Sequence, residues 1–380
     1  MPEVLPWQCE TSRTPSGTSM LELTGADVAG LLGKVDLVDV VREVFLAHAD
    51  DRTVLPEESC LRWTNDQGES CRSLNMPGLV EIEGRRIAGT KIINASLGNP
   101  DRGLPRAGGL VLLFDITTAR PVCSMDAAHI SAGRTAAVSV LAAELLWARP
   151  VRSIAVVGAG ALAEAHLDLA LRRWPSVREV HLHDQVPERA VRLAERLGDT
   201  YRTVAFDVAS SAERAVRDAE LIIPVTTTTT GYIRADWIAP GSVTVNVSLD
   251  DLLPDAFTAA DKVIVDDWSL VAADTTRLLG RMHRTGDVLP PPRHRTPAAT
   301  GRPAPAVEVA AELCDLISGA ATGRRSAQDR IVVNPFGMSL HDVAVAGKLY
   351  HDHQAGPALS TSPALSTSPA LSAGTISTTS

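Results

Sequence analysis

The stretch Ser153-Ile-Ala-Val-Val-Gly158-Ala-Gly160-Ala-Leu-Ala163 decides the fold, because it has the pattern of a buried strand, a glycine turn and the start of a helix. Gly158 permits the tight turn, and Gly160 lets the backbone come close to a pyrophosphate. Ala163 is small enough for the helix to pack on the strand. The stretch predicts a dinucleotide-binding turn, although glycines in a tight turn that binds nothing follow the same pattern.

The residues around this turn indicate which dinucleotide binds. Ala161 and Leu162, at the start of the helix, would offer free N–H groups and the positive end of the helix dipole to phosphates. The next predicted strand ends at Asp184, whose carboxylate can accept both ribose hydroxyls of an adenosine and would repel a 2′-phosphate. Arg189 lies one helical turn further along and keeps NADP open as an alternative. We expect NAD as the cofactor.

Strands and helices alternate from residue 152 onward. The predicted strands are short and rich in β-branched residues, and they lie at 153–157, 179–183, 203–206, 221–225, 243–247 and 262–265. Helices are predicted between the earlier strands, for example at 164–173 and 188–196. The alternation predicts an α/β fold with a Rossmann doubly wound parallel sheet.

Residues 20–125 follow a different pattern. Their predicted strands are separated in part by turn signals, and they lie at 71–76, 86–93, 109–114 and 121–125. Strands that follow one another this closely pair in antiparallel fashion, which predicts an α+β domain before the Rossmann domain. A long apolar helix at about 126–147 would join the two domains.

Three segments are predicted to lack regular structure. Residues 1–19 are polar and aperiodic, which indicates a loose leader. The segment 287–306 is rich in proline and is predicted to be an exposed loop. Residues 357–372 repeat the sequence PALSTS, which cannot bury a core, so we expect a disordered tail over 354–380.

The composition excludes several classes of function. The chain has 380 residues with 36 basic and 45 acidic side chains, a net charge of −9, so we expect no nucleic-acid partner. We find neither a signal-peptide pattern nor an apolar stretch long enough for a bilayer, so we expect no membrane association. The five cysteines lie far apart, which indicates reduced thiols and a cytoplasmic location. His181 and His183 share one face of a strand without a third ligand nearby, so we expect no metal.

Several segments resemble a known family. The segments 131–137, 226–230 and 245–251, with the sequences SAGRTAA, TTTTT and VNVSLDD, resemble the ornithine cyclodeaminase/μ-crystallin family. Members of that family use a bound nicotinamide cofactor to oxidise or reduce carbon–nitrogen bonds. The segments 265–269 and 334–338, VDDWS and NPFGM, are similar to one branch, the diaminopropionate-forming dehydrogenases of siderophore and peptide-antibiotic pathways.

The resemblance implies a reaction and an architecture. The branch oxidises N-(2-amino-2-carboxyethyl)-L-glutamate with NAD, and the imine hydrolyses to L-2,3-diaminopropionate and 2-oxoglutarate. The alternatives are an ornithine or lysine cyclodeaminase, an imine reductase, and a non-catalytic crystallin-type cofactor-binding protein. The implied architecture is a substrate-binding and dimerisation domain over 20–130, completed by about 328–353, and a Rossmann domain over 131–327. We therefore expect a homodimer that acts on a small amino-acid substrate.

Two basic residues in apolar surroundings are candidates for substrate binding. Lys91 lies in an apolar strand and Arg134 in an apolar helix, where each cation needs an anionic partner. Lys91 could instead extend to solvent from an edge strand, and Arg134 could form an ion pair with Asp126 or Glu144. The resemblance implies that Lys91 contacts the substrate carboxylate, that Arg134 contacts the substrate, and that Thr135 lies near the cofactor phosphates. We place Lys91 in the catalytic set as well.

Three further arginines could contact a substrate with several carboxylates. Arg62 and Arg72 flank a hairpin-like stretch, and the resemblance implies that one of them binds a carboxylate. Arg106 lies in a segment similar to one in the dehydrogenase branch. Each could equally be a solvated surface arginine.

Proton transfer is assigned to a carboxylate at the end of the fifth predicted strand of the parallel sheet. Counted from Asn246, Asp251 matches the catalytic aspartate of the family, and Asp250 leaves the assignment open by one position. A turn or a helix cap is the alternative role. The family's cyclodeaminases carry Gly-Gly-Asp where this chain has Leu-Asp-Asp, which favours the dehydrogenase branch. Thr226 and Ser248, which follow the fourth and fifth strands, are expected at the cofactor.

Overall fold

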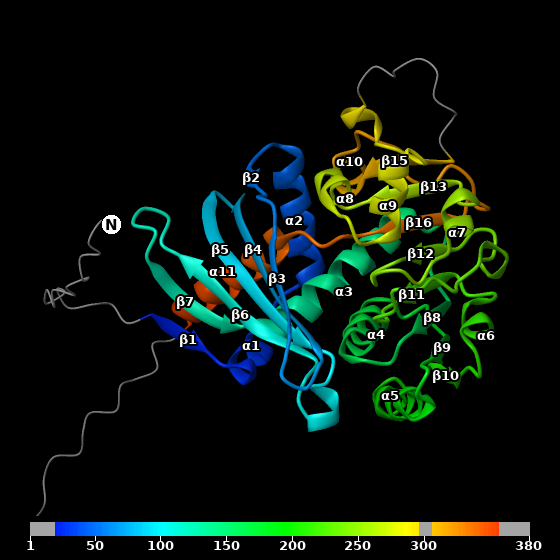
Figure 1. Cartoon of the computed structure of the whole chain (residues 1–380), viewed down its shortest axis with the longest axis horizontal. Coiled ribbons are helices and arrows are strands. Elements are labelled where there is room, and N and C mark those ends of the chain that lie inside the picture. The colour runs from blue at the N-terminus through cyan, green and yellow to red at the C-terminus, as the bar shows by residue number, and fades with distance from the viewer. Residues whose placement is uncertain (1–19, 296–305, 357–380) are drawn as a thin grey trace, which may run out of the picture.

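The computed structural model describes residues 20–295 and 306–356, which form two sheets with the long helix α3 (Ala127–Leu146) between them (Figure 1). Helix α3 corresponds to the joining helix predicted at about 126–147. The predicted leader and most of the predicted tail lie outside the described residues. Residues 354–355, which we assigned to the tail, belong instead to the last helix, α11 (Ser339–Ala355).

The larger sheet has nine strands, all parallel, and confirms the predicted fold class. Its order is β10-β9-β8-β11-β12-β16-β13-β15-β14. The strands are β8 (Ser153–Val157), β9 (Glu179–His183), β10 (Ala205–Val208), β11 (Leu221–Pro224), β12 (Val243–Val245), β13 (Lys262–Val265), β14 (Val288–Leu289), β15 (Val307–Glu312) and β16 (Ile331–Asn334). The chain order reverses between β8 and β11, which is where doubly wound sheets bind ligands.

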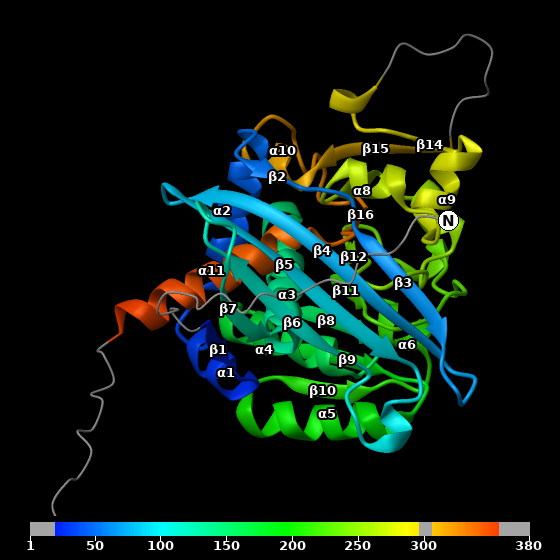
Figure 2. The same ribbon diagram turned by 60° about the vertical axis from the view of Figure 1, so that its left-hand side comes forward.

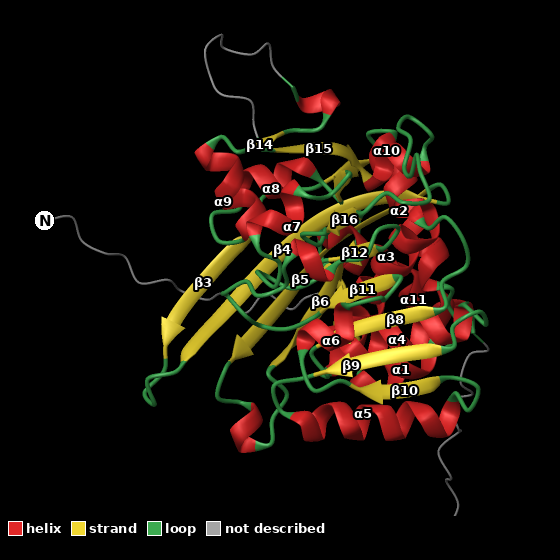
Figure 3. Ribbon diagram, turned by 90° about the vertical axis from the view of Figure 1, so that its right-hand side faces the viewer, coloured by secondary structure: helices red, strands yellow, loops and turns green. Residues whose placement is uncertain are grey.

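Helices cover both faces of this sheet (Figure 3). Alternate residues of β8 explain why, since Ile154 and Val156 pack in one apolar cluster while Ala155 and Val157 pack in the other. The first cluster includes residues of α3, α4 (Ala161–Arg173), α5 (Pro187–Thr200) and α10 (Leu313–Ile317). The second includes residues of α6 (Ala212–Val216), α7 (Pro254–Thr258), α8 (Trp268–Ala273) and α9 (Leu278–Thr285).

The smaller sheet has seven strands and is antiparallel except where β1 pairs with β7. Its strands are β1 (Leu21–Leu23), β2 (Thr53–Val54), β3 (Ser59–Thr64), β4 (Ser70–Ile82), β5 (Arg85–Ser96), β6 (Ala107–Phe114) and β7 (Pro121–Asp126). Helices α1 (Gly25–Leu32), α2 (Leu37–Ala49), α3 and α11 lie behind one face, and Figure 2 looks onto the other. An antiparallel-rich α+β arrangement was predicted for this part of the chain.

The structure corrects three predictions about the course of the chain. Strand β16 lies between β12 and β13, so the chain returns to the smaller sheet after Asn334 and not near residue 328. Strand β14 lies inside the segment predicted to be an exposed loop, and it pairs with β15, which begins just after that segment. Strand β10 begins two residues later than predicted, at Ala205. We propose that each sheet belongs to one domain and that the chain returns from the larger sheet to the smaller one after Asn334.

None of the described helices is both long enough and apolar enough to cross a membrane. The four cysteines among the described residues are free thiols, as predicted for them.

Candidate functional site

The glycine turn after β8 has the geometry that dinucleotide phosphates need. Gly158 has φ +97°, and a Cβ there would lie 3.1 Å from the carbonyl oxygen of Val225. Gly160 is the N-cap of α4 and has no side-chain cap, so backbone N–H groups at the start of α4 are free for an anion. Of the first two residues of α4, Ala161 is exposed and Leu162 is half-buried.

Asp184 lies at the end of β9, beside this turn. One oxygen of its carboxylate accepts the backbone N–H of Ala159 at 2.8 Å, and the other accepts that of Val186 at 2.8 Å. The aspartate therefore fixes the glycine turn against the neighbouring strand. These residues fit an adenine dinucleotide, since Asp184 would accept its ribose hydroxyls and the start of α4 would bind its pyrophosphate.

Lys91 and Arg134 meet at one buried carboxylate, that of Asp342. Lys91 is 2% exposed, and its Nζ donates to Oδ2 of Asp342 at 2.8 Å and to Ser131 Oγ at 3.5 Å. Nε of Arg134 lies 3.2 Å from the same Oδ2. The structure thus brings together two predicted residues from β5 and α3 through a third, on α11, that the sequence analysis missed.

These contacts differ from the structural alternatives considered for both cations, because Asp342 is the buried anionic partner of each. Lys91 cannot extend to solvent from an edge, because β5 pairs with β4 on one side and β6 on the other. The two acids proposed as partners of Arg134 are used elsewhere. Asp126 caps the start of α3, and Glu144 accepts from Nε of Arg173 at 2.6 Å.

The shared carboxylate leaves the pair of cations short of negative charge. Burial lowers the pKa of Lys91 to about 8, although Asp342 opposes this effect. Burial would raise the pKa of Asp342, but Arg134 and Lys91 outweigh it and hold that pKa below its usual value. One carboxylate faces two buried cations, so a second carboxylate could bind beside them. Glu58, which precedes β3, is a half-buried acid whose pKa is raised, because burial outweighs the opposing charges of Lys91, Arg277 and Arg134.

The loop between β16 and α11 fixes the position of Arg134. Gly337 has φ +98°, and a Cβ there would lie 3.2 Å from Nη1 of Arg134. The carboxylate of Asp266 accepts the backbone N–H groups of Phe336 at 2.8 Å and Gly337 at 2.6 Å. The segments 265–269 and 334–338, which were singled out separately in the sequence, therefore contact each other beside Arg134.

Asp251 is fully buried and accepts three hydroxyl groups. Thr226 Oγ1 donates at 2.7 Å and the Tyr232 hydroxyl at 2.5 Å, and Ser248 Oγ donates as well. Burial raises the pKa of Asp251, and these hydroxyl groups oppose the effect. The structure thus brings together three predicted residues at the ends of β11 and β12, and adds Tyr232, which the sequence analysis missed.

Asp250 points to a different partner. Its carboxylate accepts the backbone N–H of Leu278 at 2.6 Å and Nη1 of Arg281 at 2.9 Å. It therefore anchors the start of α9, which is the capping role considered for this pair of aspartates. Within residues 20–295 and 306–356, no hydrogen bond or ion pair joins Asp251 to Lys91 or Arg134.

The three additional arginines lie at one end of the smaller sheet. Arg62 and Arg72 are directly opposite each other on β3 and β4, with Arg62 exposed and Arg72 half-buried. Arg106 is half-buried, and burial together with the charge of Arg72 lowers its pKa. Thr135 lies beside Arg134 on α3 and donates to the carbonyl of Ser131 at 2.7 Å.

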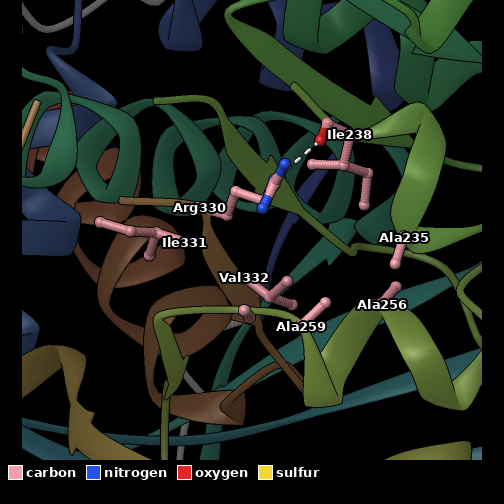
Figure 4. A pocket seen from close by; sticks show the side chains of 8 residues that line it. Ala235, Ile238, Ala256, Ala259, Arg330, Ile331 and Val332 are labelled. Atoms are coloured by element: carbon pink, nitrogen blue, oxygen red, sulfur yellow. Dashed lines mark hydrogen bonds between the residues drawn. The ribbon is translucent and has the colours of Figure 1, made fainter. Parts of the chain in front are cut away.

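A small apolar hollow lies elsewhere on the larger sheet (Figure 4). It lies beside the first residues of β16, at the edge opposite to the glycine turn, and Nε of Arg330 donates across it to the carbonyl of Ile238 at 2.9 Å. It has no room for a water molecule, so it is not a ligand site.

Comparisons with known proteins identify a family and similar folds. Residues 70–356 match the model of the ornithine cyclodeaminase/mu-crystallin family. The chain is 30% identical to N-((2S)-2-amino-2-carboxyethyl)-L-glutamate dehydrogenase of Staphylococcus aureus, over 88% of this chain and 96% of that protein. The crystal structure of CmnK is 36% identical, with a TM-score of 0.78 over 89% of this chain and 96% of that one. A Delta(1)-pyrroline-2-carboxylate reductase of Thermococcus litoralis, solved with NADH and L-proline, shares the fold at 20% identity, with a TM-score of 0.76 over 88% of this chain and 98% of that one.

Proposed function

This chain belongs to the ornithine cyclodeaminase/mu-crystallin family, and we propose that it is an NAD-dependent dehydrogenase acting on the CH–NH bond of N-(2-amino-2-carboxyethyl)-L-glutamate. The products would be L-2,3-diaminopropionate and 2-oxoglutarate. The observation that carries the proposal is the pair of buried cations, Lys91 and Arg134, that share the single carboxylate of Asp342. The Staphylococcus aureus relative supports the choice of substrate.

Each group of side chains would have one role in this reaction. Lys91 and Arg134 would bind the α-carboxylate of the glutamate unit and so orient its α-carbon. The nicotinamide cofactor, when bound, would accept the hydride from that carbon. Asp251 would take the proton from the secondary amine as the hydride leaves, and Tyr232 and Thr226 would hold its carboxylate in place. Water would then add to the imine and release the amine and the 2-oxo acid.

The cofactor assignment rests on the glycine turn and on Asp184. Ala159 through Leu162 would surround the pyrophosphate, Asp184 would bind the adenosine ribose, and Thr226, Ser248 and Thr135 would lie along the remainder of the dinucleotide. The structures of family relatives with bound NADH or NAD support NAD as the cofactor.

The open face of the smaller sheet supports a homodimer. The strand register places Leu61, Trp63 and Leu110 on the face away from the helices, where they are 65%, 45% and 47% exposed. An apolar sheet face of this kind is typical of a protein interface. We therefore propose that two copies pair through it.

A direct assay tests the proposed function. The purified protein would be supplied with NAD and the glutamate conjugate, reduced cofactor would be followed by absorbance, and products would be identified by mass spectrometry. Ornithine, lysine and Delta(1)-pyrroline-2-carboxylate with NADH are the comparison substrates, because Bacillus cereus Delta(1)-pyrroline-2-carboxylate reductase is 25% identical over 87% of this chain and 96% of that protein. Conversion of ornithine to proline with no reaction of the conjugate would contradict the proposal.

A further inference from the structure

Arg277 precedes α9 and lies near both parts of the proposed site, the cations Lys91 and Arg134 and the carboxylate of Asp251. The backbone N–H of the next residue, Leu278, donates to Asp250 at 2.6 Å, beside the proposed proton acceptor Asp251. The guanidinium of Arg277 also lies over the ring of Phe336, with 4.5 Å between its Cζ and the ring centroid.

Phe336 connects Arg277 to Arg134, one of the two cations proposed to bind the substrate. It precedes Gly337, the residue against which Arg134 packs. Nη1 of Arg277 donates to the carbonyl of Phe336 at 3.1 Å and to that of Pro335 at 3.5 Å. The backbone from Pro335 to Gly337 thus separates the two guanidinium groups, and Arg277 lies at the edge of the site that holds Lys91 and Arg134.

The guanidinium of Arg277 uses only part of its hydrogen-bonding capacity. Its Nε lies 3.6 Å from Oδ2 of Asp274, and in the part of the chain that the structure describes Nη2 makes no hydrogen bond. The side chain is 21% exposed, and burial lowers its pKa. A planar guanidinium with one edge on backbone carbonyls can present the other edge to a carboxylate.

Two more arginines, Arg72 and Arg106, lie at one end of the smaller sheet. Arg72 on β4 is opposite Ala95 of β5, and Ala95 is opposite Ala107, the first residue of β6, so Arg72 and Arg106 lie near the same end of these strands. Burial, and after it the charge of Arg72, lowers the pKa of Arg106. Burial is also the main cause that lowers the pKa of Arg277, where Asp274, Asp266 and Glu58 oppose it and Arg72 adds to it. Like charges that are brought together and partly buried are stabilised by a bound anion.

We propose that Arg277, with Arg72 and Arg106, binds a second carboxylate of the substrate and determines the preference for a dicarboxylate. The inference rests on the proposed function, because it assumes that the first carboxylate lies at Lys91 and Arg134. In N-(2-amino-2-carboxyethyl)-L-glutamate, the second carboxylate would be that of the glutamate side chain. This adds Arg277 to the residues that were expected from the sequence.

Binding of two matched 2-oxo acids tests this assignment without any need for turnover. 2-Oxoglutarate carries the distal carboxylate and 2-oxobutyrate lacks it, so calorimetry in the presence of NADH compares them directly. We expect the wild type to bind 2-oxoglutarate at least tenfold more tightly. Arg277→Gln should weaken 2-oxoglutarate roughly 10- to 100-fold and leave 2-oxobutyrate within about twofold, because one charge-assisted contact is lost. Arg284→Gln, which changes an exposed arginine on the helix that follows Arg277, should change neither affinity.

Arg277 also holds the loop before α11, so a second variant is needed. Arg72→Gln removes a cation whose side chain makes no hydrogen bond among the described residues, and it should reduce the preference for 2-oxoglutarate in the same direction. Equal weakening of both oxo acids in the two variants, or no preference in the wild type, would overturn the inference. A wild type that prefers 2-oxoglutarate yet does not oxidise the glutamate conjugate would contradict the proposed function alone.

Discussion

At the scale of single residues, the site depends on one carboxylate that serves two cations. Lys91 and Arg134 could be predicted from the sequence, because a cation in an apolar strand or helix must find an anion. Their partner Asp342 could not, since it lies 251 positions after Lys91 on another element. The available signal was an acid at residue 342, next to His341 and directly before the apolar run 343–347.

The pH dependence of substrate binding should reveal this carboxylate. The charged form of Lys91 binds substrate, so kcat/KM should be retained below about pH 8 and fall as the pH rises above it. Asp342→Asn removes a charge that raises the pKa of Lys91, so the alkaline limb should move to lower pH. A pH profile of kcat/KM measures the alkaline limb in the wild type and in Asp342→Asn. Lys91→Met, whose side chain cannot titrate, should lack the alkaline limb. An alkaline limb that stays in place in Asp342→Asn would show that the two residues are not coupled.

Substitution of each neighbouring aspartate by asparagine should distinguish the role of Asp250 from that of Asp251. Asp251→Asn should lower kcat roughly 100- to 10 000-fold, because it removes the proposed proton acceptor. Asp250→Asn should mainly lower the melting temperature, because it weakens the anchor of α9 at Leu278 and Arg281. Steady-state kinetics and thermal unfolding of both variants decide between them. The opposite pattern would move the catalytic role to Asp250.

At the scale of elements, the loop before α11 links fold and site. Gly337→Ala should cost about 1 kcal/mol or more of stability because of its positive φ, and should raise KM by displacing Arg134. Gly319→Ala is the matched control, because Gly319 also has positive φ, +78°, but no atom lies within 4 Å of its added Cβ. Unfolding and kinetics should show similar destabilisation and a raised KM in Gly337→Ala alone. An unchanged KM there would mean that the loop does not position Arg134.

The elements differ in how far sequence could predict them. Strand β8 and helix α4 follow from a local pattern of apolar residues and glycines, and β9 and β13 were predicted with the bounds observed. Strand β16 was missed, because its four residues owe their place to partners far away, on β12 and β13. Long-range pairing of this kind has no local signal. Because β16 was missed, the return of the chain to the smaller sheet was predicted too early, near residue 328.

At the scale of the whole molecule, the open face of the smaller sheet should pair two copies. Leu110→Asp places a charge on that face and should convert a dimer into a monomer. Val191→Asp changes an exposed residue on α5, a helix that packs on the larger sheet, and should leave the dimer intact. Size-exclusion chromatography with light scattering measures both. A monomeric wild type, or a dimer that survives Leu110→Asp, would contradict the proposed interface.

The most direct test of the proposed function follows one hydrogen atom. N-(2-amino-2-carboxyethyl)-L-glutamate would be deuterated at the α-carbon of its glutamate unit and incubated with NAD and the wild-type protein. We predict that mass spectrometry will find deuterium in the reduced cofactor, together with unlabelled 2,3-diaminopropionate and 2-oxoglutarate. Absence of label from the reduced cofactor, or a conjugate that remains intact while ornithine is converted, would contradict the proposed function.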